Sequence, residues 1–155
     1  INIHQNNNQM TRINTCIPKL LTDQHLLGEY NEIRRPVNLA VKRYEKYGKD
    51  SFKDLPKNYQ LGPGHVLFFY DKLEYLHKRF DAICDEMRAR GFAVNTGFDR
   101  DRIPDALYND WNPPDYAVTI LKKRLKEKIE STKPFWRYYR KPINNNKYFK
   151  SVLHI

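Results

Sequence analysis

The 155 residues of this chain are enough for one domain with a real core, but not comfortably for two. A hydrophobic content of 40%, with 14% aromatic residues, excludes a largely disordered protein. Lys and Arg number 28 against 18 Asp and Glu, and the resulting net charge of +10 favours a polyanionic partner, most often nucleic acid, over a merely solvated basic surface.

The cysteines and the apolar runs exclude several further classes. Cys16 and Cys84 are isolated, and neither a Cys-x-x-Cys pair nor a His spacing closes a zinc site, so no metal is expected. Two isolated thiols favour a reducing compartment over a secreted scaffold. No apolar run approaches the ~20 residues of a membrane span, and residues 1–9 do not have the pattern of a secretory signal.

The first predicted elements are a polar extension and two helical segments. Residues 1–9 are rich in amide side chains and indicate a flexible extension, with the fold beginning near Met10. Thr22 is placed to cap a helix, and Pro36 should interrupt or kink that helix. A second helical pattern then continues to Gly48. The apolar positions at helical spacing in the first of these helices are Leu26, Leu27, Tyr30 and Ile33.

Two longer helices are predicted in the rest of the chain. The longest spans residues 64–91 and ends at Gly91, where a left-handed cap belongs. After an irregular stretch, Asn112 can cap a last helix that continues to about residue 132. The predicted apolar positions are Val66, Phe69, Leu73, Leu76, Phe80, Ile83 and Met87 in the first of these helices, and Ala117, Ile120, Leu121, Leu125 and Ile129 in the second. With weak strand signals throughout, the sequence predicts an all-α fold: one compact domain of three main helices, irregular loops and an aromatic, basic C-terminal segment.

Three groups of residues are candidates for function. Residues 134–141, "PFWRYYRK", interleave aromatic rings with cations, as base stacking and phosphate pairing require; the alternative is an aromatic plug on the core with solvated cations. Glu29 and Glu32 lie one turn apart on the first helix; a solvated acidic face is the usual meaning, but a carboxylate that faces a bound polyanion is costly unless it does chemistry. Several cations would form one basic surface if the first and last helices adjoin: Arg12, Arg34, Arg35, Arg124 and Lys128.

Several blocks of the sequence together resemble one family. In order, they are "MTRIN" (10–14), "LTDQHLLGEYNEI" (21–33), "LGPGHVLFFYDKLEYLHKR" (61–79), "RGF" (90–92) and "FWRYYRKPI" (135–143). This order is similar to that of phage endonuclease V, in the pyrimidine dimer DNA glycosylase family. The resemblance covers residues 10–143, and it implies a small all-helical repair enzyme for the cyclobutane dimers that ultraviolet light makes in DNA.

The resemblance also implies a mechanism. Its catalytic residues would be Thr11, whose α-amino group is the nucleophile once Met10 is removed, and Glu32, which stabilises the cationic sugar and assists proton transfers. The amine expels the damaged base and forms a Schiff base, and elimination then breaks the strand; no metal or other cofactor is used. An α-amine, with a pKa near ~7.7–8.0, is partly unprotonated at neutral pH, unlike a lysine near ~10.4.

The resemblance implies DNA contacts as well. Asn31 departs from it, because phage relatives commonly have a basic residue at that position. The implied DNA-binding residues are Arg12, Gln24, His25, Arg35, Arg124, Lys128, Trp136, Arg137, Tyr138 and Tyr139.

The terminal segments leave one alternative open. With residues 1–9 attached, Thr11 has an amide nitrogen, which is not a nucleophile, so the chain would be an inactive homologue that serves as a DNA-binding or assembly protein. We therefore expect three parts: an extension (1–9), a glycosylase-like domain (10–143) and a C-terminal extension (144–155). The expected partner is duplex DNA with ultraviolet photoproducts, bound by a monomer whose extensions could take a protein partner. The expected setting is the cytoplasm of a prokaryotic host or another DNA-containing compartment, with a viral origin in keeping with the phage resemblance.

Overall fold

The computed structural model describes residues 13–132 and 135–155, and it shows an all-α domain, as predicted. Beside the helices, the described residues contain only one small antiparallel hairpin, β1 with β2. Short 3-10 turns connect several of the helices. The elements are α1 (Asp23–Glu32), α2 (Arg34–Tyr47), α3 (Leu73–Ala89), α4 (Asp115–Ser131), β1 (Arg137–Tyr138), β2 (Lys141–Pro142) and the single-turn α5 (Asn145–Tyr148).

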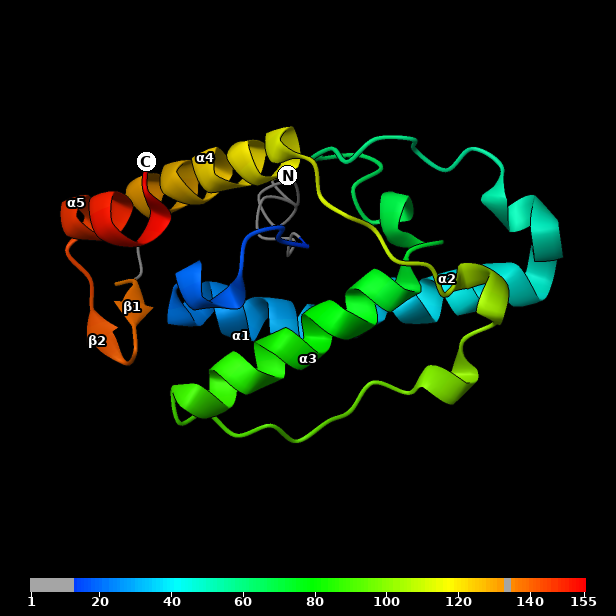
Figure 1. Ribbon diagram of the computed structural model, residues 1–155, viewed down its shortest axis with the longest axis horizontal. Coiled ribbons are helices and arrows are strands. Elements are labelled where there is room, and N and C mark those ends of the chain that lie inside the picture. Colours follow the sequence, from blue (N-terminus) through cyan, green and yellow to red (C-terminus); the bar gives the residue numbers. More distant parts are fainter. Residues whose placement is uncertain (1–12, 133–134) are drawn as a thin grey trace, which may run out of the picture.

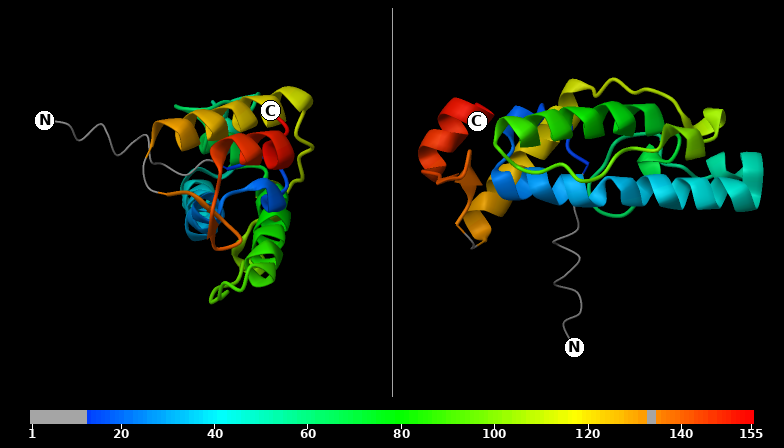
Figure 2. Two further views of the ribbon diagram at one scale, coloured as in Figure 1. Left: turned by 90° about the vertical axis from the view of Figure 1, so that its left-hand side faces the viewer. Right: turned by 90° about the horizontal axis from the view of Figure 1, so that it is seen from below.

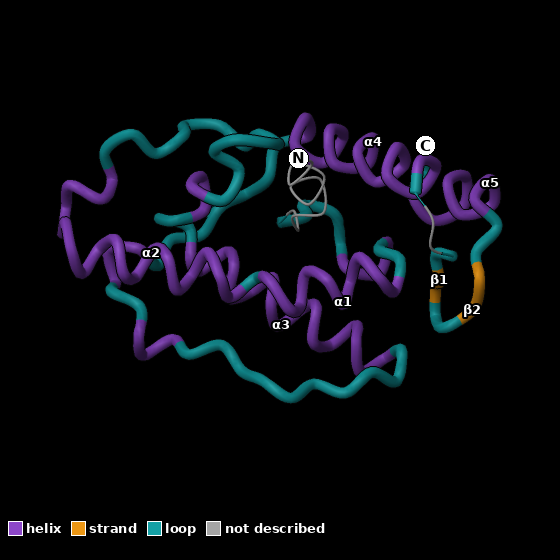
Figure 3. The backbone as a smooth tube through the Cα atoms, turned by 180° about the vertical axis from the view of Figure 1, so that it is seen from behind, coloured by secondary structure: helices purple, strands orange, loops and turns teal. Residues whose placement is uncertain are grey.

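The helices form two levels. α1 and α2 follow one another along the long axis of the molecule, and α3 packs against α1 (Figure 1). α4 and α5 lie together on the other level, above α1 and α3 in Figure 1, and the end-on view in Figure 2 shows the same separation. The hairpin lies at the end of the molecule where α1 begins, as the view from behind in Figure 3 also shows.

The core occupies the space between these levels. The stripe of α3 is buried as predicted from Leu73 to Met87, and so is that of α4, except for Ile120, which is 38% exposed and whose predicted burial was wrong. The C-terminal segment adds to the same core through Tyr148, Phe149 and Leu153. Residues 144–155 therefore contribute side chains to this core. None of the helices in the described ranges combines the length and apolar character needed to cross a membrane.

The break between α1 and α2 follows from Pro36. A proline ring clashes with the carbonyl of the residue four positions earlier, which here is Glu32. α1 ends at Glu32, Ile33 separates the two helices, and Pro36 is in the first turn of α2. The predicted interruption is confirmed, and its effect is to place Glu32 at the last position of α1.

The predicted helix over residues 64–91 begins only at Leu73. Leu67–Phe69 form a 3-10 turn, and Lys72, with φ −125° and ψ 43°, interrupts the helical backbone. Phe68 and Phe69 are both buried, and their ring centroids lie 5.0 and 5.7 Å from that of Trp111. The aromatic cluster turns this segment away from the helix axis. The predicted cap is confirmed, because Gly91 has φ +82°.

α4 begins after its prolines rather than at the predicted cap. Its N-cap residue is Pro114, which makes no side-chain capping bond, so the prediction that Asn112 caps the helix was wrong. The α conformation is disfavoured for a residue that precedes a proline, which keeps Pro113 out of the helix. Asp115 lies in the first turn, where its charge meets the positive end of the helix dipole.

Candidate active site

Glu29 is the centre of a buried polar network. Its side chain is fully buried, and the Arg79 guanidinium donates to both of its carboxylate oxygens, with Nε at 2.7 Å and Nη2 at 3.0 Å. Asn14 Nδ2 donates to the same carboxylate at 2.5 Å, and Arg79 also donates to the carbonyl of Cys16. Burial alone would lower the pKa of Arg79, but the charge and hydrogen bonds of Glu29 outweigh it and raise that pKa. Glu29 is therefore committed to holding α1, α3 and residues 14–16 together.

Glu32, one turn further along α1, has the opposite surroundings. Its side chain is exposed, and its carboxylate has no hydrogen bond or ion pair to any residue in the described part of the chain. Asp23 and Glu29, the other acidic residues of α1, are both buried. Glu32 is thus the carboxylate of α1 that is open to a ligand.

The backbone of Ile13 and Asn14 is held by hydrogen bonds from and to three side chains. The amide of Ile13 donates to His65 Nε2 at 2.8 Å, and its carbonyl accepts from the hydroxyl of Tyr59 at 3.2 Å. The carbonyl of Asn14 accepts from the hydroxyl of Tyr75 at 3.2 Å. Thr11 and Arg12 lie outside the described residues, so the structure places neither. It does place Asn14, two residues after Arg12, beside Glu29.

His25 and Trp136, both predicted DNA contacts, stack on each other. Their ring centroids lie 4.4 Å apart with an interplanar angle of 3°. His25 Nδ1 lies 2.6 Å from the hydroxyl of Thr22, which also caps α1 by accepting from the His25 amide, as predicted. Burial and the nearby charge of Lys128 lower the pKa of His25 to about 4, so the imidazole is neutral at physiological pH. The structure thus brings His25, Lys128 and Trp136 together.

Gln24, another predicted DNA contact, holds the aromatic segment. Its Nε2 donates to the carbonyl of Phe135 at 2.5 Å, and its Oε1 accepts from the amide of Arg137 at 2.9 Å. One amide side chain therefore fixes the backbone on both sides of Trp136. Whether Gln24 also contacts DNA remains a prediction.

Asp23 holds the turn of the hairpin. Tyr139 and Arg140 have φ +50° and +66°, the left-handed conformations of a type I′ turn, which side-chain-bearing residues adopt at a cost of about 1–2 kcal/mol each. Their two amides donate to the Asp23 carboxylate at 3.1 and 2.7 Å. These charge-assisted bonds offset the cost of the turn.

Arg90 also holds the hairpin, because it pairs with Asp23 and contacts two of the hairpin's rings. It is buried, pairs with Asp23 at 2.9 Å and Glu86 at 2.9 Å, and its guanidinium lies 4.8 and 4.7 Å from the ring centroids of Tyr138 and Tyr139. Sequence reasoning missed Arg90 and the role of Asp23. No local pattern could have revealed them, because Asp23 bonds residues 116 and 117 positions away.

The remaining predicted cations in the described residues lie on two helices, α2 and α4. Arg124 and Lys128 are one turn apart on α4, and both are partly exposed. Arg35 is exposed at the start of α2, close enough to Tyr70 that its charge opposes the rise in pKa that burial causes there. Arg34 lies elsewhere again, in a hollow of about 120 Å³ together with Phe98 and other residues of the 97–102 loop. The single basic surface of five cations remains a prediction.

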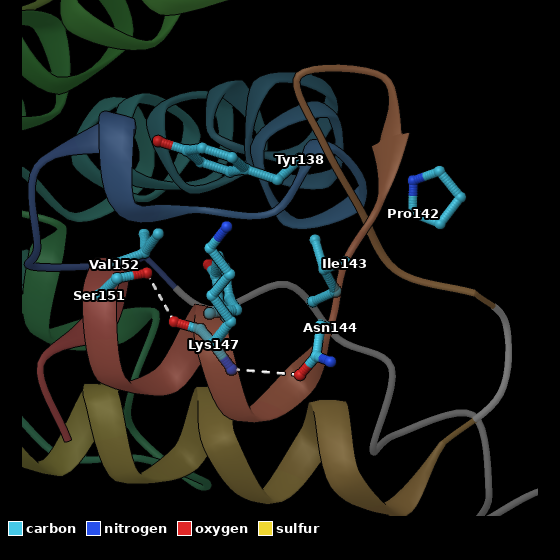
Figure 4. Close-up of a pocket in the computed structure, with 8 residues that line it drawn as sticks. Tyr138, Pro142, Ile143, Asn144, Lys147, Ser151 and Val152 are labelled. Carbon is cyan, nitrogen blue, oxygen red and sulfur yellow. Dashed lines mark hydrogen bonds between the residues drawn. The ribbon is translucent and has the colours of Figure 1, made fainter.

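Two larger hollows flank the hairpin. One, of about 380 Å³, lies on the side of α1 and is lined by Asp23, Gln24, Leu27, Phe92, Arg137 and Arg140. The other, of about 270 Å³, lies between Tyr138 and the C-terminal segment (Figure 4). In the second hollow, the Lys147 amide and the Ser151 hydroxyl already bond within their own segment, as the dashed lines show. The first hollow, with two arginines at its edge, is the one suited to an anion.

The metal-binding residue types are not clustered in the described ranges. No group of three or more His, Cys, Asp or Glu side chains there has the geometry to hold a metal ion. Both cysteines, Cys16 and Cys84, are buried and unbridged, and burial raises the pKa of each thiol.

A comparison with known families identifies the chain. The family model described as pyrimidine dimer DNA glycosylase matches residues 10–100, which is more than half of the sequence. The protein therefore belongs to the pyrimidine dimer DNA glycosylase family, a family of DNA repair enzymes whose substrate is DNA. The match contains Thr11 and the whole of α1, and it ends before α4 and the aromatic segment.

Proposed function

We propose that the protein is a DNA glycosylase with an associated abasic-site lyase activity, and that it acts on cyclobutane pyrimidine dimers in duplex DNA. The family match supports a DNA repair glycosylase. The observation that carries the finer proposal is the position of Glu32, an exposed carboxylate at the end of α1. It lies one turn from Glu29, which binds Asn14, three residues after Thr11.

Thr11 is the proposed nucleophile. Its α-amine, when free, forms a bond to C1′ of the deoxyribose, while the bond from C1′ to the base breaks and the base leaves with the electron pair and takes up a proton. The nitrogen then loses a proton, and its lone pair forms the second bond to C1′ while the C1′–O4′ bond breaks and O4′ takes up a proton, which gives a Schiff base. Removal of a proton from C2′ then expels the 3′ phosphate and breaks the strand. A covalent intermediate of this kind divides one difficult step into easier ones.

The anchored backbone limits how far this amine can lie from Ile13. Two residues of chain reach at most about 7 Å, and Ile13 is fixed by His65 and Tyr59. In the proposed mechanism, the Glu32 carboxylate stabilises the positive charge that develops on the sugar and moves protons between nitrogen, C2′ and solvent. The exposed setting of Glu32 leaves it accessible for both tasks.

Reductive trapping tests the proposal. A chain prepared with Thr11 as its first residue is incubated with a duplex that contains one cyclobutane thymine dimer, in the presence of borohydride. We expect a covalent protein–DNA adduct with the dimer duplex and none with the undamaged duplex. The same chain with a blocked α-amine is the matched control, and it should give no adduct.

The trapping experiment also separates the proposal from its rival. A chain that binds the dimer duplex but gives neither adduct nor strand cleavage, with Thr11 verified as its first residue, would be a DNA-binding protein without catalysis. The predicted DNA contacts, including Arg12, Arg35, Arg124 and Lys128, apply to both cases. Both therefore predict binding that weakens steeply with salt, because each phosphate contact adds about 0.9 to the log–log slope.

A further inference from the structure

Residues 135–138 form an extended segment whose side chains alternate between two faces. Phe135 and Arg137 are exposed, whereas Trp136 and Tyr138 are partly buried. Successive side chains of an extended backbone point to opposite faces. The outer face therefore presents an aromatic ring together with a cation, and the inner face presents two aromatic rings to the protein.

The inner rings are occupied by contacts within the protein. Trp136 stacks on His25, and its Nε1 is buried. The hydroxyl of Tyr138 donates to the carbonyl of Lys19 at 2.8 Å, and its ring lies on the Arg90 guanidinium. Rings that are held in this way anchor the segment and are poorly placed to stack on a base.

Tyr139, in the turn, is held as well. Its ring lies 4.7 Å from the Arg90 guanidinium, and its hydroxyl donates to Glu86 at 2.6 Å. Its amide is bonded to Asp23, as described above. Tyr139 therefore belongs with the anchors of the segment.

Phe135 differs from all three. It is 81% exposed, the largest value among the exposed large hydrophobic residues in the described part of the chain. Its backbone is nevertheless fixed, because Gln24 bonds its carbonyl and the amide of Arg137. A partner that covers this ring would remove apolar surface from water, which is favourable.

The surroundings of Phe135 fit a nucleic acid as that partner. Arg137 shares its outer face, and the hollow of about 380 Å³ next to Gln24 is edged by Arg137 and Arg140. The carboxylate of Asp23 in this hollow is already neutralised by Arg90. Phenylalanine is also one of the side chains that proteins wedge between base steps to unstack and kink DNA.

We propose that Phe135 is the residue that inserts into the base stack beside the lesion, with Arg137 on an adjacent phosphate, and that Trp136, Tyr138 and Tyr139 serve to hold it in place. This inference rests on the function proposed above. Unstacking costs least where a base is already damaged, so a wedge at this position favours dimer-containing DNA over intact duplex.

The test compares three variants of the chain that begins with Thr11. Phe135→Ala removes the ring, Phe135→Trp keeps an aromatic ring, and Tyr47→Ala removes a matched exposed ring, 54% accessible, at the far end of α2 (Figure 1). Because the Phe135 ring is so exposed, its loss should leave thermal unfolding unchanged. Binding is measured by fluorescence anisotropy with dimer and undamaged duplexes, and unstacking is measured by the fluorescence of 2-aminopurine placed next to the dimer.

We expect Phe135→Ala to weaken binding to the dimer duplex by about 5-fold to 150-fold, the usual loss for one stacked base, and to abolish the 2-aminopurine increase. Phe135→Trp and Tyr47→Ala should behave like the unsubstituted chain. Equal binding and unstacking by Phe135→Ala would overturn the inference, and so would an equal loss in Phe135→Trp. If the unsubstituted chain still forms the borohydride adduct with the dimer duplex when either of these results is found, only the inference about Phe135 fails. If the unsubstituted chain forms no adduct and does not prefer the dimer duplex, the proposed function fails and the inference fails with it.

Discussion

Two carboxylates of α1, one turn apart, have opposite surroundings: Glu29 is buried, and Glu32, at the end of the helix, is exposed. At Glu29, Arg79 and Asn14 satisfy the carboxylate inside the protein. At Glu32, the helix ends because of Pro36, and the carboxylate faces outward. The difference shows that three residues of spacing do not decide the role of a carboxylate. The cation on the facing helix and the proline downstream decide it.

The largest expected effect comes from the open end. Glu32→Gln removes the charge and the proton-transfer group but no described contact, so strand cleavage at a dimer should fall by about 10²-fold to 10⁴-fold while thermal unfolding stays the same. Single-turnover cleavage of a dimer duplex measures the first, and circular dichroism measures the second. Cleavage at the parental rate would remove Glu32 from the mechanism and leave its exposure without a function.

The next largest effect comes from removing the buried ion pair between Arg79 and Glu29. Arg79→Met leaves the Glu29 charge buried without its partner, and breaking such a pair typically costs 3–5 kcal/mol of unfolding free energy. Urea denaturation measures the loss. Arg88→Met is the matched control, because Arg88 is on the same helix in an exposed pair with Asp85, and it should change stability by less than about 0.5 kcal/mol. Similar losses in the two variants would mean that the Glu29 network does not stabilise the fold.

A smaller effect concerns His25 in the first turn of α1, whose burial makes the free energy of unfolding depend on pH. His25 has a pKa lowered to about 4 in the folded protein, against 6.5 for the free side chain, so the unfolded chain binds the proton more tightly. Its contribution to stability is therefore complete above about pH 6.5 and is lost as the pH falls towards 4. Between pH 7.5 and 5.0 the loss is about 2 kcal/mol.

Urea denaturation at these two pH values tests this prediction. His25→Gln should remove about 2 kcal/mol of the difference between pH 7.5 and pH 5.0. His154→Gln, at an exposed histidine near the C-terminus, should leave the difference as it is. An unchanged pH dependence in His25→Gln would show that the imidazole charges freely and that its stack on Trp136 is loose.

The smallest expected effect concerns Arg124, a predicted DNA contact on α4. Arg124→Met should reduce the slope of log Kd against log salt by about 1 if Arg124 contacts one phosphate. Anisotropy titrations between 50 and 200 mM salt, with an undamaged duplex, measure the slope. Arg88→Met again serves as the control and should leave the slope unchanged. An unchanged slope in Arg124→Met would place the DNA path elsewhere on the molecule.

The sequence predicts what depends on neighbours along the chain. The Thr22 cap, the interruption caused by Pro36 and the cap at Gly91 are all local effects, and all three are confirmed. The start of α3 was wrong because Phe68 and Phe69 pack on Trp111, a contact more than forty positions away that no periodicity shows.

The same limit applies to the candidate site. The sequence distinguishes Glu29 from Glu32 only through the resemblance, because the partner of Glu29 is on another helix, fifty positions away. Arg79 gave a faint signal, since it is a charged residue between the apolar positions Leu76 and Phe80 of a buried stripe. The sequence singled out the aromatic segment, but only its packing shows which rings are held and that Phe135 is open.

The most direct test of the central claim is to locate the trapped sugar on the chain. After borohydride trapping on a dimer duplex, the chain that begins with Thr11 is digested with nuclease and protease, and the modified peptide is sequenced by mass spectrometry. We predict that the reduced deoxyribose fragment is on the α-nitrogen of Thr11. An adduct on a lysine such as Lys128, or no adduct at all, would contradict the account.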